Sequence, residues 1–274
     1  MKTVLITGTS TGIGLQTAVQ AAEAGWQVIA TMRDPHKAAG LRAALPGVDV
    51  RPLDVVDDAS VQACVAGVLA DHGHLDAVVN NAGSGHLGTI ELETLADVRQ
   101  VMEVNFFGAV RVTRAALPHL RAVQGRLVTV TSVGGIVGQP FNEAYCAAKF
   151  ALEGWLESLA PVVRALGVQV SVIEPGPVAT EFVANIQASR DVQAMVTGAG
   201  DYRPLIENYL ARTSQSFVNA QSAVDVAAVC LRALTDPEPH FRYLTSDWVG
   251  QFTALRLADP DGSRVQAQTA TWIS

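Results

Sequence analysis

Ser132, Tyr145 and Lys149 have the side chains needed to move a proton on and off a secondary alcohol, and they share the stretch TVTSVGGIVGQPFNEAYCAAKFALEG. Tyr145 and Lys149 are four positions apart, so a helix would present both on one face. A free phenol ionises near pH ~10, and an adjacent ammonium group favours the phenolate and lowers that pKa. Ser132 would hydrogen-bond the reacting oxygen. Because the same Tyr and Lys spacing is common on ordinary surface helices, the rest of the sequence has to decide between chemistry and packing.

Short apolar runs alternate with helix-length stretches, which is typical of βαβ units that build a parallel sheet. Asp57 is a candidate N-cap, and Pro35 suits a first helical turn. We expect a Rossmann-type, doubly wound α/β fold with a seven-stranded parallel sheet, helices on both faces and one domain over 1–274. The predicted strands are 4–7, 26–32, 48–53, 75–80, 125–132, 168–174 and 239–245. The predicted helices are 12–24, 35–44, 57–72, 94–121, 143–166 and 222–235.

The segment at about 181–221 interrupts this alternation, between the sixth strand and the next long helix. It contains the turn sequence GAGDYRP, and we expect short helices around 187–196 and 203–213. An ordinary surface insertion is the simpler interpretation. Segments of this length in α/β folds are more often lids or binding loops, so we predict a substrate loop here.

Composition excludes several classes of protein. The net charge is −7 and the pI near 5.3, with no Lys/Arg-rich run, which argues against a nucleic-acid partner. No apolar run is long enough for a signal-peptide core or a membrane span. Cys64, Cys146 and Cys230 are widely spaced and form no CxxC pair, so we expect a reducing compartment and no metal site. The sequence is therefore expected to encode a cytoplasmic protein.

The first predicted strand ends in TGTSTGIG, followed by a helix, which is the context in which a glycine turn binds a dinucleotide. Bare backbone lets a pyrophosphate approach, and the helix N-terminus offers free N–H groups to the anion. No Lys-Ser/Thr pair follows, which excludes a nucleotide-hydrolysing P-loop. The turn and its first helical residues, Gly8, Thr11, Gly12, Ile13 and Gly14, are the candidate cofactor contacts.

The end of the second predicted strand, ATMRDP, discriminates between the two nicotinamide cofactors. Met32 stands where an acidic residue would hold a ribose diol, and Arg33 follows with a planar fork suited to a 2′-phosphate. Thr11 could add a hydroxyl contact. Asp34 could instead cap the next helix or accept a hydrogen bond from the ribose. The sequence thus favours NADP over NAD.

These motifs, in order and with similar gaps, resemble the short-chain dehydrogenase/reductase family over nearly the whole chain. The resemblance makes Ser132, Tyr145 and Lys149 the catalytic triad and Asn105 in VMEVNFFG a fourth catalytic residue. It also implies that Tyr145 and Lys149 contact the cofactor. Further cofactor contacts implied by the motifs LDV, NNAG and PGPVAT are Asp54, Val55, Asn81, Ala82, Gly83, Pro175, Gly176, Val178 and Thr180.

The resemblance is closer still to the family branch of the type 1 17β-hydroxysteroid dehydrogenases and photoreceptor-type retinol dehydrogenases. It rests on SVGGIVGQPFNEAYCAAKFALEGWLESLA, on FRYLTSDWVGQFTALRLADPDGS and on ATMRDP. Arg212 stands where the estrogenic enzymes carry a histidine that helps recognise the distal hydroxyl of a steroid. This departure argues against estrogen specificity and leaves the reaction unchanged.

The family implies a mechanism of carbonyl reduction. Tyr145 would donate a proton to the substrate oxygen as hydride arrives, while Ser132 hydrogen-bonds that oxygen. Lys149 would lower the pKa of Tyr145 and bind the nicotinamide ribose. Asn105 would support a water linking Lys149 to solvent, or pin a helix kink, or both.

The substrate is expected to be a bulky, hydrophobic ketone or secondary alcohol. His86 fits the role of a loop residue better than that of a catalyst. Met195, Leu205, Tyr209 and Phe217 would line the pocket or simply form core. The residues expected to surround the substrate are Ser132, Val133, Gln139, Asn142, Tyr145, Glu181 and Phe182.

Three other interpretations stay open. An NADP-binding redox-sensing regulator would keep the fold and lose the chemistry, an NAD-dependent alcohol dehydrogenase would differ in cofactor, and a sugar-nucleotide epimerase or dehydratase shares the Tyr and Lys pair. The helices at 94–121 and 143–166 resemble those through which this family forms homodimers and homotetramers.

Overall fold

The structure is a computed structural model that describes residues 1–180, 192–218 and 220–273. Its centre is a seven-stranded, all-parallel sheet in the order β3-β2-β1-β4-β5-β6-β9, as the sequence predicts. The strand order reverses between β1 and β4, the point at which doubly wound sheets bind ligands. The strands are β1 Thr3–Thr7, β2 Gln27–Met32, β3 Asp49–Pro52, β4 Ala77–Asn80, β5 Arg126–Val130, β6 Gln169–Glu174 and β9 Arg242–Leu244.

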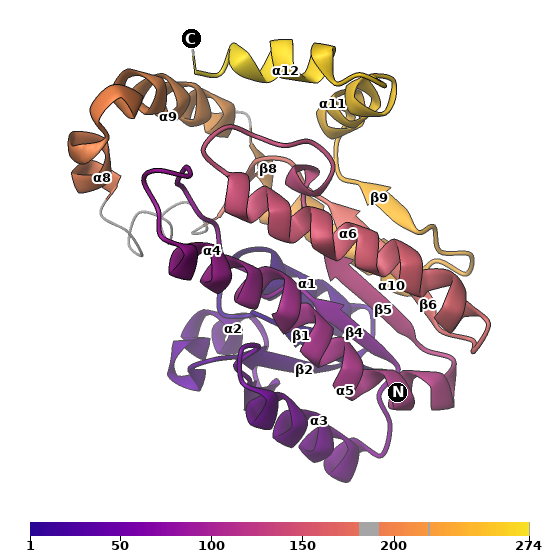
Figure 1. Cartoon of the computed structure of the whole chain (residues 1–274). Coiled ribbons are helices and arrows are strands. Elements are labelled where there is room, and N and C mark those ends of the chain that lie inside the picture. The colour runs from indigo at the N-terminus through magenta and orange to yellow at the C-terminus, as the bar shows by residue number, and fades with distance from the viewer. Residues whose placement is uncertain (181–191, 219, 274) are drawn as a thin grey trace.

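Helices cover both faces of the sheet (Figure 1). Leu5 of β1 packs into the core on one face, while Val4 and Ile6 pack into the core on the other. Both sides of the strand are therefore apolar, which explains the continuous hydrophobic runs in the sequence. The first face is covered by α3 Asp58–His72, α5 Gly108–Val123 and α6 Glu143–Arg164, and the second by α1 Gly12–Glu23, α2 Ala39–Ala44 and α10 Ala223–Thr235.

The helix predicted at 94–121 is divided in the structure. It consists of α4 Leu95–Met102, a π-helical turn Glu103–Phe107 and α5. Asn105 lies in this turn, where its side-chain amide donates to the carbonyls of Val101 (3.1 Å) and Ser84 (2.9 Å) and accepts from the Ser84 N–H (3.1 Å). A side chain that satisfies backbone groups in this way stabilises the interruption of the helix.

The helix starts predicted at Asp57 and Pro35 are confirmed. Asp57 caps α3 by accepting from the Ala59 N–H, and Pro35 opens a 3₁₀ turn that precedes α2. Asp34 caps that turn, since its carboxylate accepts from the His36 N–H at 3.0 Å. The single helix expected at 35–44 is thus a 3₁₀ turn followed by a short α-helix.

The part of the chain after β6 contains elements beyond the sequence prediction. A two-stranded parallel ladder pairs β7 Val178–Ala179 with β8 Gln221–Ser222 and so joins the two ends of the expected substrate loop. Within that loop the structure places α8 Val192–Gly198 and α9 Arg203–Val218; the helix expected at 187–196 lies partly outside the described residues. Two further helices follow β9, α11 Asp247–Leu257 and α12 Ser263–Ala270, and Figure 1 shows α8, α9, α11 and α12 at the end of the molecule away from α3.

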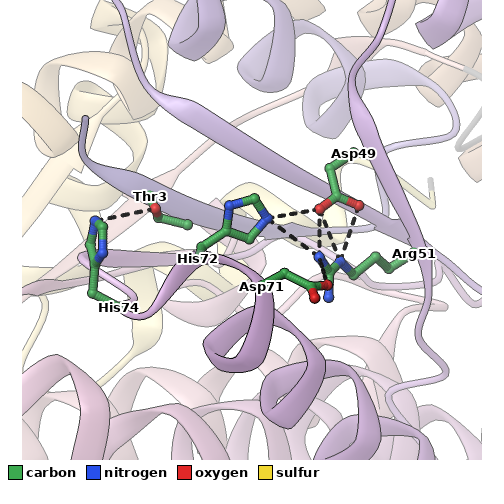
Figure 2. Close-up of polar contacts among 6 residues, drawn as sticks. All are labelled: Thr3, Asp49, Arg51, Asp71, His72 and His74. Atoms are coloured by element: carbon green, nitrogen blue, oxygen red, sulfur yellow. Dashed lines mark hydrogen bonds and ion pairs between the residues drawn. The ribbon is translucent and has the colours of Figure 1, made fainter.

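An ion-pair cluster joins the edge strand β3 to the C-terminal end of α3 (Figure 2). The Arg51 guanidinium donates to both carboxylate oxygens of Asp49 (Nη2 to Oδ2, 2.6 Å) and also to Asp71. His72 contacts Asp49 at 3.0 Å. Burial raises the pKa of Asp49, but the hydrogen bonds with Arg51 and His72 outweigh it and hold that pKa below its ordinary value of 3.8. The Asp49 carboxylate therefore stabilises the fold when it is ionised.

Replacing Asp49 by Asn is expected to lower the free energy of unfolding by about 1 kcal/mol at neutral pH, because a bidentate charged pair is lost. Since the pKa of Asp49 is depressed, the difference from the wild type should be fully present above pH about 5 and disappear as the pH falls below 3.8. Urea denaturation at several pH values measures it. The matched control is Asp71→Asn, which removes a 63% exposed partner of the same arginine and should change stability little. Equal losses for both variants would contradict this assignment.

Within the described residues, no helix is both long and apolar enough to cross a membrane. Cys64, Cys146 and Cys230 are buried and free. The described part of the chain also gathers no group of three or more His, Cys, Asp or Glu side chains of the kind that hold a metal ion.

Candidate active site

The glycine turn after β1 is too tight for side chains. Gly8 and Gly12 have φ angles of +72° and +59°, which favour glycine. A Cβ atom on Gly14 would lie 2.3 Å from the Gly8 carbonyl oxygen, so α1 approaches the strand end as closely as backbone permits. The N-cap residue Thr11 makes no side-chain capping hydrogen bond with any residue that the structure describes. Ile13 packs against the apolar core that contains Val4 and Ile6 of β1. The bare, uncapped helix start is a suitable cradle for an anion.

The NNAG motif, residues 80–83, joins β1 to β4 at the carboxyl ends of these strands, beside the glycine turn. The Asn81 side chain donates to the carbonyls of Thr7 (2.9 Å) and Gly8 (3.0 Å), and the Thr7 hydroxyl accepts from the backbone of Asn81 and Ala82. A Cβ on Gly83 would lie 2.9 Å from Asn105 Oδ1 and 3.7 Å from Lys149 Nζ. The motif therefore links the glycine turn directly to the candidate catalytic residues.

Three other predicted cofactor residues follow the carboxyl ends of β2 and β3. Arg33 is exposed at the end of β2, next to the buried Met32. Asp54 is partly buried and its carboxylate accepts from the Val56 N–H at 3.2 Å, while Val55 is buried beneath it against Gly108.

The PGPVAT loop closes over the glycine turn from the other side. A Cβ on Gly12 would lie 3.2 Å from the Thr180 side chain, and Val178 is anchored in β7. The Pro175 carbonyl accepts from the Val133 N–H at 2.9 Å, and Gly176 packs on α11. The loop thus contacts both the glycine turn and the residue after Ser132.

The structure brings the predicted triad together. Ser132 follows β5 and is 9% exposed; its Oγ accepts from the Gly134 N–H at 3.0 Å. Tyr145 and Lys149 lie one turn apart on α6, with Lys149 Nζ 5.8 Å from the Tyr145 ring centroid. Lys149 is 5% exposed, and its ammonium donates to the Val130 carbonyl at 3.2 Å.

The electrostatics of the pair differ from the expectation that Lys149 lowers the pKa of Tyr145. Burial raises the pKa of Tyr145 to about 12, and the hydrogen bond with Ser132 only partly opposes it. Burial also lowers the pKa of Lys149 to about 8, although the nearby Glu153 carboxylate raises it. The physical reason is that both groups lose water, which disfavours the phenolate and the ammonium alike. At neutral pH Tyr145 is therefore a neutral phenol, the form that donates a proton.

Of the predicted substrate residues, Val133, Gln139 and Asn142 lie on the segment between Ser132 and α6. Val133 is buried against α11, and Asn142 donates to the Tyr209 hydroxyl at 2.5 Å. Gln139 lines a pocket of about 610 Å³ between this segment and the α11–α12 connection, whose lining includes neither Ser132 nor Tyr145. Glu181 and Phe182 lie outside the described residues.

The apolar residues of α8 and α9 form core rather than open surface. Met195, Leu205 and Tyr209 pack with Leu87 and Phe141 in one cluster, while Phe217 is partly buried outside it. This cluster lies beside Asn142 and so forms a wall above the start of α6.

Arg212 and His86 also have specific partners. The Arg212 guanidinium lies 5.3 Å from the ring centroid of Trp272, beyond α12, which ties α9 to the C-terminal segment. The His86 ring nitrogen Nε2 pairs with the Glu93 carboxylate at 2.5 Å, and the Glu93 side chain is 4% exposed.

Three charged residues close to Lys149 are missing from the predicted site. Glu153, one turn after Lys149 on α6, and Glu174, at the end of β6, are 4% and 0% exposed, and Arg242 of β9 binds both. Glu153, four positions after Lys149 in a predicted helix, was the available signal in the sequence. Arg242 is 89 residues from Glu153 and 68 residues from Glu174, so no local pattern reveals that it binds them.

Comparison with known proteins identifies the family. The family model described as short chain dehydrogenase matches residues 2–191. Retinol dehydrogenase 8 from Bos taurus is 39% identical over 273 residues, covering 96% of this chain and 87% of that protein. The human 17-beta-hydroxysteroid dehydrogenase type 1 is 41% identical over 272 residues, covering 95% and 82%.

Solved structures agree with the fold. A short-chain dehydrogenase/reductase from Burkholderia phymatum in complex with NAD is 26% identical and superposes with a TM-score of 0.80, covering 94% of this chain and 93% of that one. The chain therefore belongs to the short-chain dehydrogenase/reductase family, as an oxidoreductase related to hydroxysteroid and retinol dehydrogenases that uses a nicotinamide cofactor.

Proposed function

We propose that the protein transfers a hydride between NADP(H) and a bulky hydrophobic ketone or secondary alcohol. The observation that carries this proposal is the meeting of Ser132, Tyr145 and Lys149 beside Gly83, which adjoins the glycine turn. Proton-handling groups and a dinucleotide cradle at one sheet edge are what carbonyl reduction requires.

The residues present fit a dinucleotide. Gly8, Gly12 and Gly14 pack so closely that a Cβ on them would contact other residues at 2.3 to 3.2 Å. The start of α1 carries no side-chain cap among the described residues, which would leave its backbone N–H groups for a pyrophosphate. Arg33 and Asp54 would hold the adenosine end. The remaining contacts would come from Thr11, Ile13, Val55, Asn81, Ala82, Gly83, Pro175, Gly176, Val178 and Thr180, with Tyr145 and Lys149 on the nicotinamide ribose. The bound cofactor supplies or accepts the hydride.

The protein's own residues would handle the proton. The neutral Tyr145 phenol donates it to the substrate oxygen in reduction, and Ser132 holds that oxygen. Lys149 keeps a positive charge near the phenol, which stabilises the phenolate that forms. Asn105, fixed by Val101 and Ser84, supports the proton path from Lys149.

The relatives' names and the apolar surroundings support a hydrophobic substrate. One relative is named for retinol and another for a 17-beta-hydroxysteroid. The walls beside Ser132 and Asn142 are formed by buried apolar clusters that contain Val133 and Phe141. The test is NADPH oxidation, followed by absorbance, with a 17-ketosteroid, retinal and aryl ketones. Consumption with the 17-ketosteroid or an aryl ketone supports the proposal. Retinal is an aldehyde, so consumption with retinal alone would indicate an aldehyde reductase instead. Tight NADPH binding with no turnover of any of them would favour a redox-sensing regulator.

NADP rather than NAD is supported by the residues after β2. Arg33 is exposed and available for a 2′-phosphate. Asp34, the one acid beside it, already accepts the His36 N–H as an N-cap. An Asp engaged in capping is a poor partner for the ribose diol of NAD.

Replacing Arg33 by Ala is expected to weaken NADPH binding about 10- to 100-fold, because a charged contact to the 2′-phosphate is lost, and to leave NADH binding unchanged. Fluorescence titration with both cofactors measures the change. The matched control is Arg42→Ala, an exposed arginine of α2 whose guanidinium contacts the Pro35 carbonyl. Equal weakening for both cofactors in the Arg33 variant would contradict the assignment.

We also propose that residues 1–274 act as one cytoplasmic domain in a homodimer or homotetramer. One sheet uses strands from Thr3 to Leu244, which supports a single domain. Phe107 and Phe150, on α4–α5 and α6 respectively, are 44% and 38% exposed, which supports an interface there. Sedimentation velocity determines the oligomeric state.

A further inference from the structure

A second set of charges is buried directly behind the catalytic lysine. Glu153 lies one turn after Lys149 on α6, and Glu174 ends β6 just before the PGPVAT loop. Their side chains are 6% and 0% exposed. Such carboxylates are rarely buried unless something holds them in place.

Arg242 of β9 holds both carboxylates. Its Nη1 donates to Glu153 Oε2 and to Glu174 Oε1 (2.6 Å), and its Nη2 reaches the exposed Glu157 (2.9 Å). The opposite oxygen of Glu174, Oε2, is buried and accepts no hydrogen bond from any residue that the structure describes, whereas Glu153 also interacts with the Thr131 side chain. One guanidinium therefore serves two buried acids and leaves Glu174 half satisfied.

The arrangement favours one negative charge between the two acids. Burial and the neighbouring Glu153 carboxylate raise the pKa of Glu174 to about 7, against the opposing effect of Arg242. Burial also raises the pKa of Glu153, and a hydrogen bond with the Thr131 side chain, together with the charges of Arg242 and Lys149, opposes that rise. Glu153 interacts with two cations, Arg242 and Lys149, whereas Arg242 is the one cation that acts on Glu174 among the described residues. The charge therefore resides mainly on Glu153.

Glu153 also has a fixed position relative to the reacting residues. A Cβ on Gly135 would lie 2.9 Å from Glu153 Cγ and 3.1 Å from the Lys149 carbonyl oxygen, so the loop that starts at Ser132 packs on both. Glu153 is the acid whose charge acts on Lys149. It touches no reacting atom, which makes it a positioning residue.

We propose that Glu153, held by Arg242 against Glu174, is the counter-charge that keeps the buried Lys149 ammonium protonated. This inference rests on the proposed function, in which a charged Lys149 stabilises the Tyr145 phenolate and binds the cofactor ribose. Glu174 carries the one proton of the pair and so leaves Arg242 able to keep Glu153 ionised.

The protonation of Lys149 is directly measurable because the chain has three lysines, Lys2, Lys37 and Lys149. Labelling with [ε-¹³C]lysine gives three resonances, which Lys2→Arg and Lys37→Arg assign. We expect Lys149 in the wild type to titrate with a pKa of about 8, well below the ordinary value of 10.5. In Glu153→Gln the proton affinity of Lys149 should fall about tenfold, because its counter-charge is removed.

Glu157→Gln is the matched control, since it removes an exposed partner of the same arginine on the same helix and should leave the Lys149 titration unchanged. An unchanged titration in folded Glu153→Gln would overturn the proposal. If that variant does not fold, Glu153→Asp keeps the charge on a shorter side chain and should leave the Lys149 titration close to that of the wild type. A fall in the proton affinity of Lys149 as large as about tenfold in Glu153→Asp would overturn the proposal equally. The readout needs neither cofactor nor substrate, so failure of the proposed function would appear separately, as absent ketone reduction.

Discussion

Replacing Tyr145 by Phe is expected to lower kcat for ketone reduction by about 10²- to 10⁴-fold, because the proton donor is removed while the ring is kept. NADPH affinity should change by less than about tenfold, since the phenol is one of many cofactor contacts. Steady-state NADPH oxidation, with NADPH affinity measured by fluorescence, separates the two effects.

The matched control for this variant is Tyr243→Phe. Tyr243 lies in β9, at the edge of the sheet, and is also buried; its hydroxyl accepts from the His240 N–H. Loss of this hydroxyl should leave kcat unchanged. A Tyr145→Phe protein that binds NADPH and keeps most of its ketone-reducing rate would contradict the role given to Tyr145.

Replacing Gly14 by Ala is expected to abolish measurable NADPH binding and to lower the free energy of unfolding by about 1 to 3 kcal/mol, since the new methyl group overpacks the turn. Its Cβ would lie 2.3 Å from the Gly8 carbonyl oxygen and 2.4 Å from Asn81 Nδ2. Neither atom can withdraw, because one is backbone and the other braces β1 against β4. Fluorescence titration and urea denaturation measure the two losses.

Gly154→Ala provides the comparison for the same substitution in an open position. Gly154 lies in α6, and a Cβ there would meet no atom within 4 Å apart from those of its own helix and chain neighbours. Alanine is the better helix former, so stability should be unchanged or rise by about 0.5 to 1 kcal/mol. Retention of wild-type NADPH affinity in Gly14→Ala would show that the turn is looser than its geometry indicates.

The sheet and the triad were predictable from the sequence because their determinants are local. Parallel strands buried on both faces are continuous apolar runs, as in β1 and β6, and their helices begin at readable caps such as Asp57. Tyr145 and Lys149 share a helix face by spacing alone. The same logic places the glycine turn between a strand and a helix.

The features that escaped prediction depend on contacts distant in sequence or on burial. A helix kink pinned by Asn105 was one of the predicted alternatives, but the π-helical form of the turn and its partner Ser84, 21 residues from Asn105, were not predictable. The β7 and β8 ladder has two residues in each strand, too few for any pattern. The direction of the Tyr145 pKa shift depends on how much water is lost, which residue spacing does not reveal.

The C-terminal helices are an intermediate case. Ser246 caps α11 by accepting from the Val249 N–H, which is a readable start signal. The packing of Trp272 against Phe252 of α11 and Arg212 of α9 is what fixes the segment in place, and it joins residues 20 and 60 positions apart (272 minus 252 and 272 minus 212).

The most direct test of hydride transfer uses NADPH deuterated at C4 of the nicotinamide, separately on each face, with the ketone that the wild-type protein turns over fastest. For one of the two labelled cofactors, nuclear magnetic resonance of the product alcohol should show deuterium on the carbinol carbon, and Tyr145→Phe should form this product about 10²- to 10⁴-fold more slowly. A protein that binds NADPH yet transfers deuterium from neither face to any ketone of the panel would contradict the proposed function.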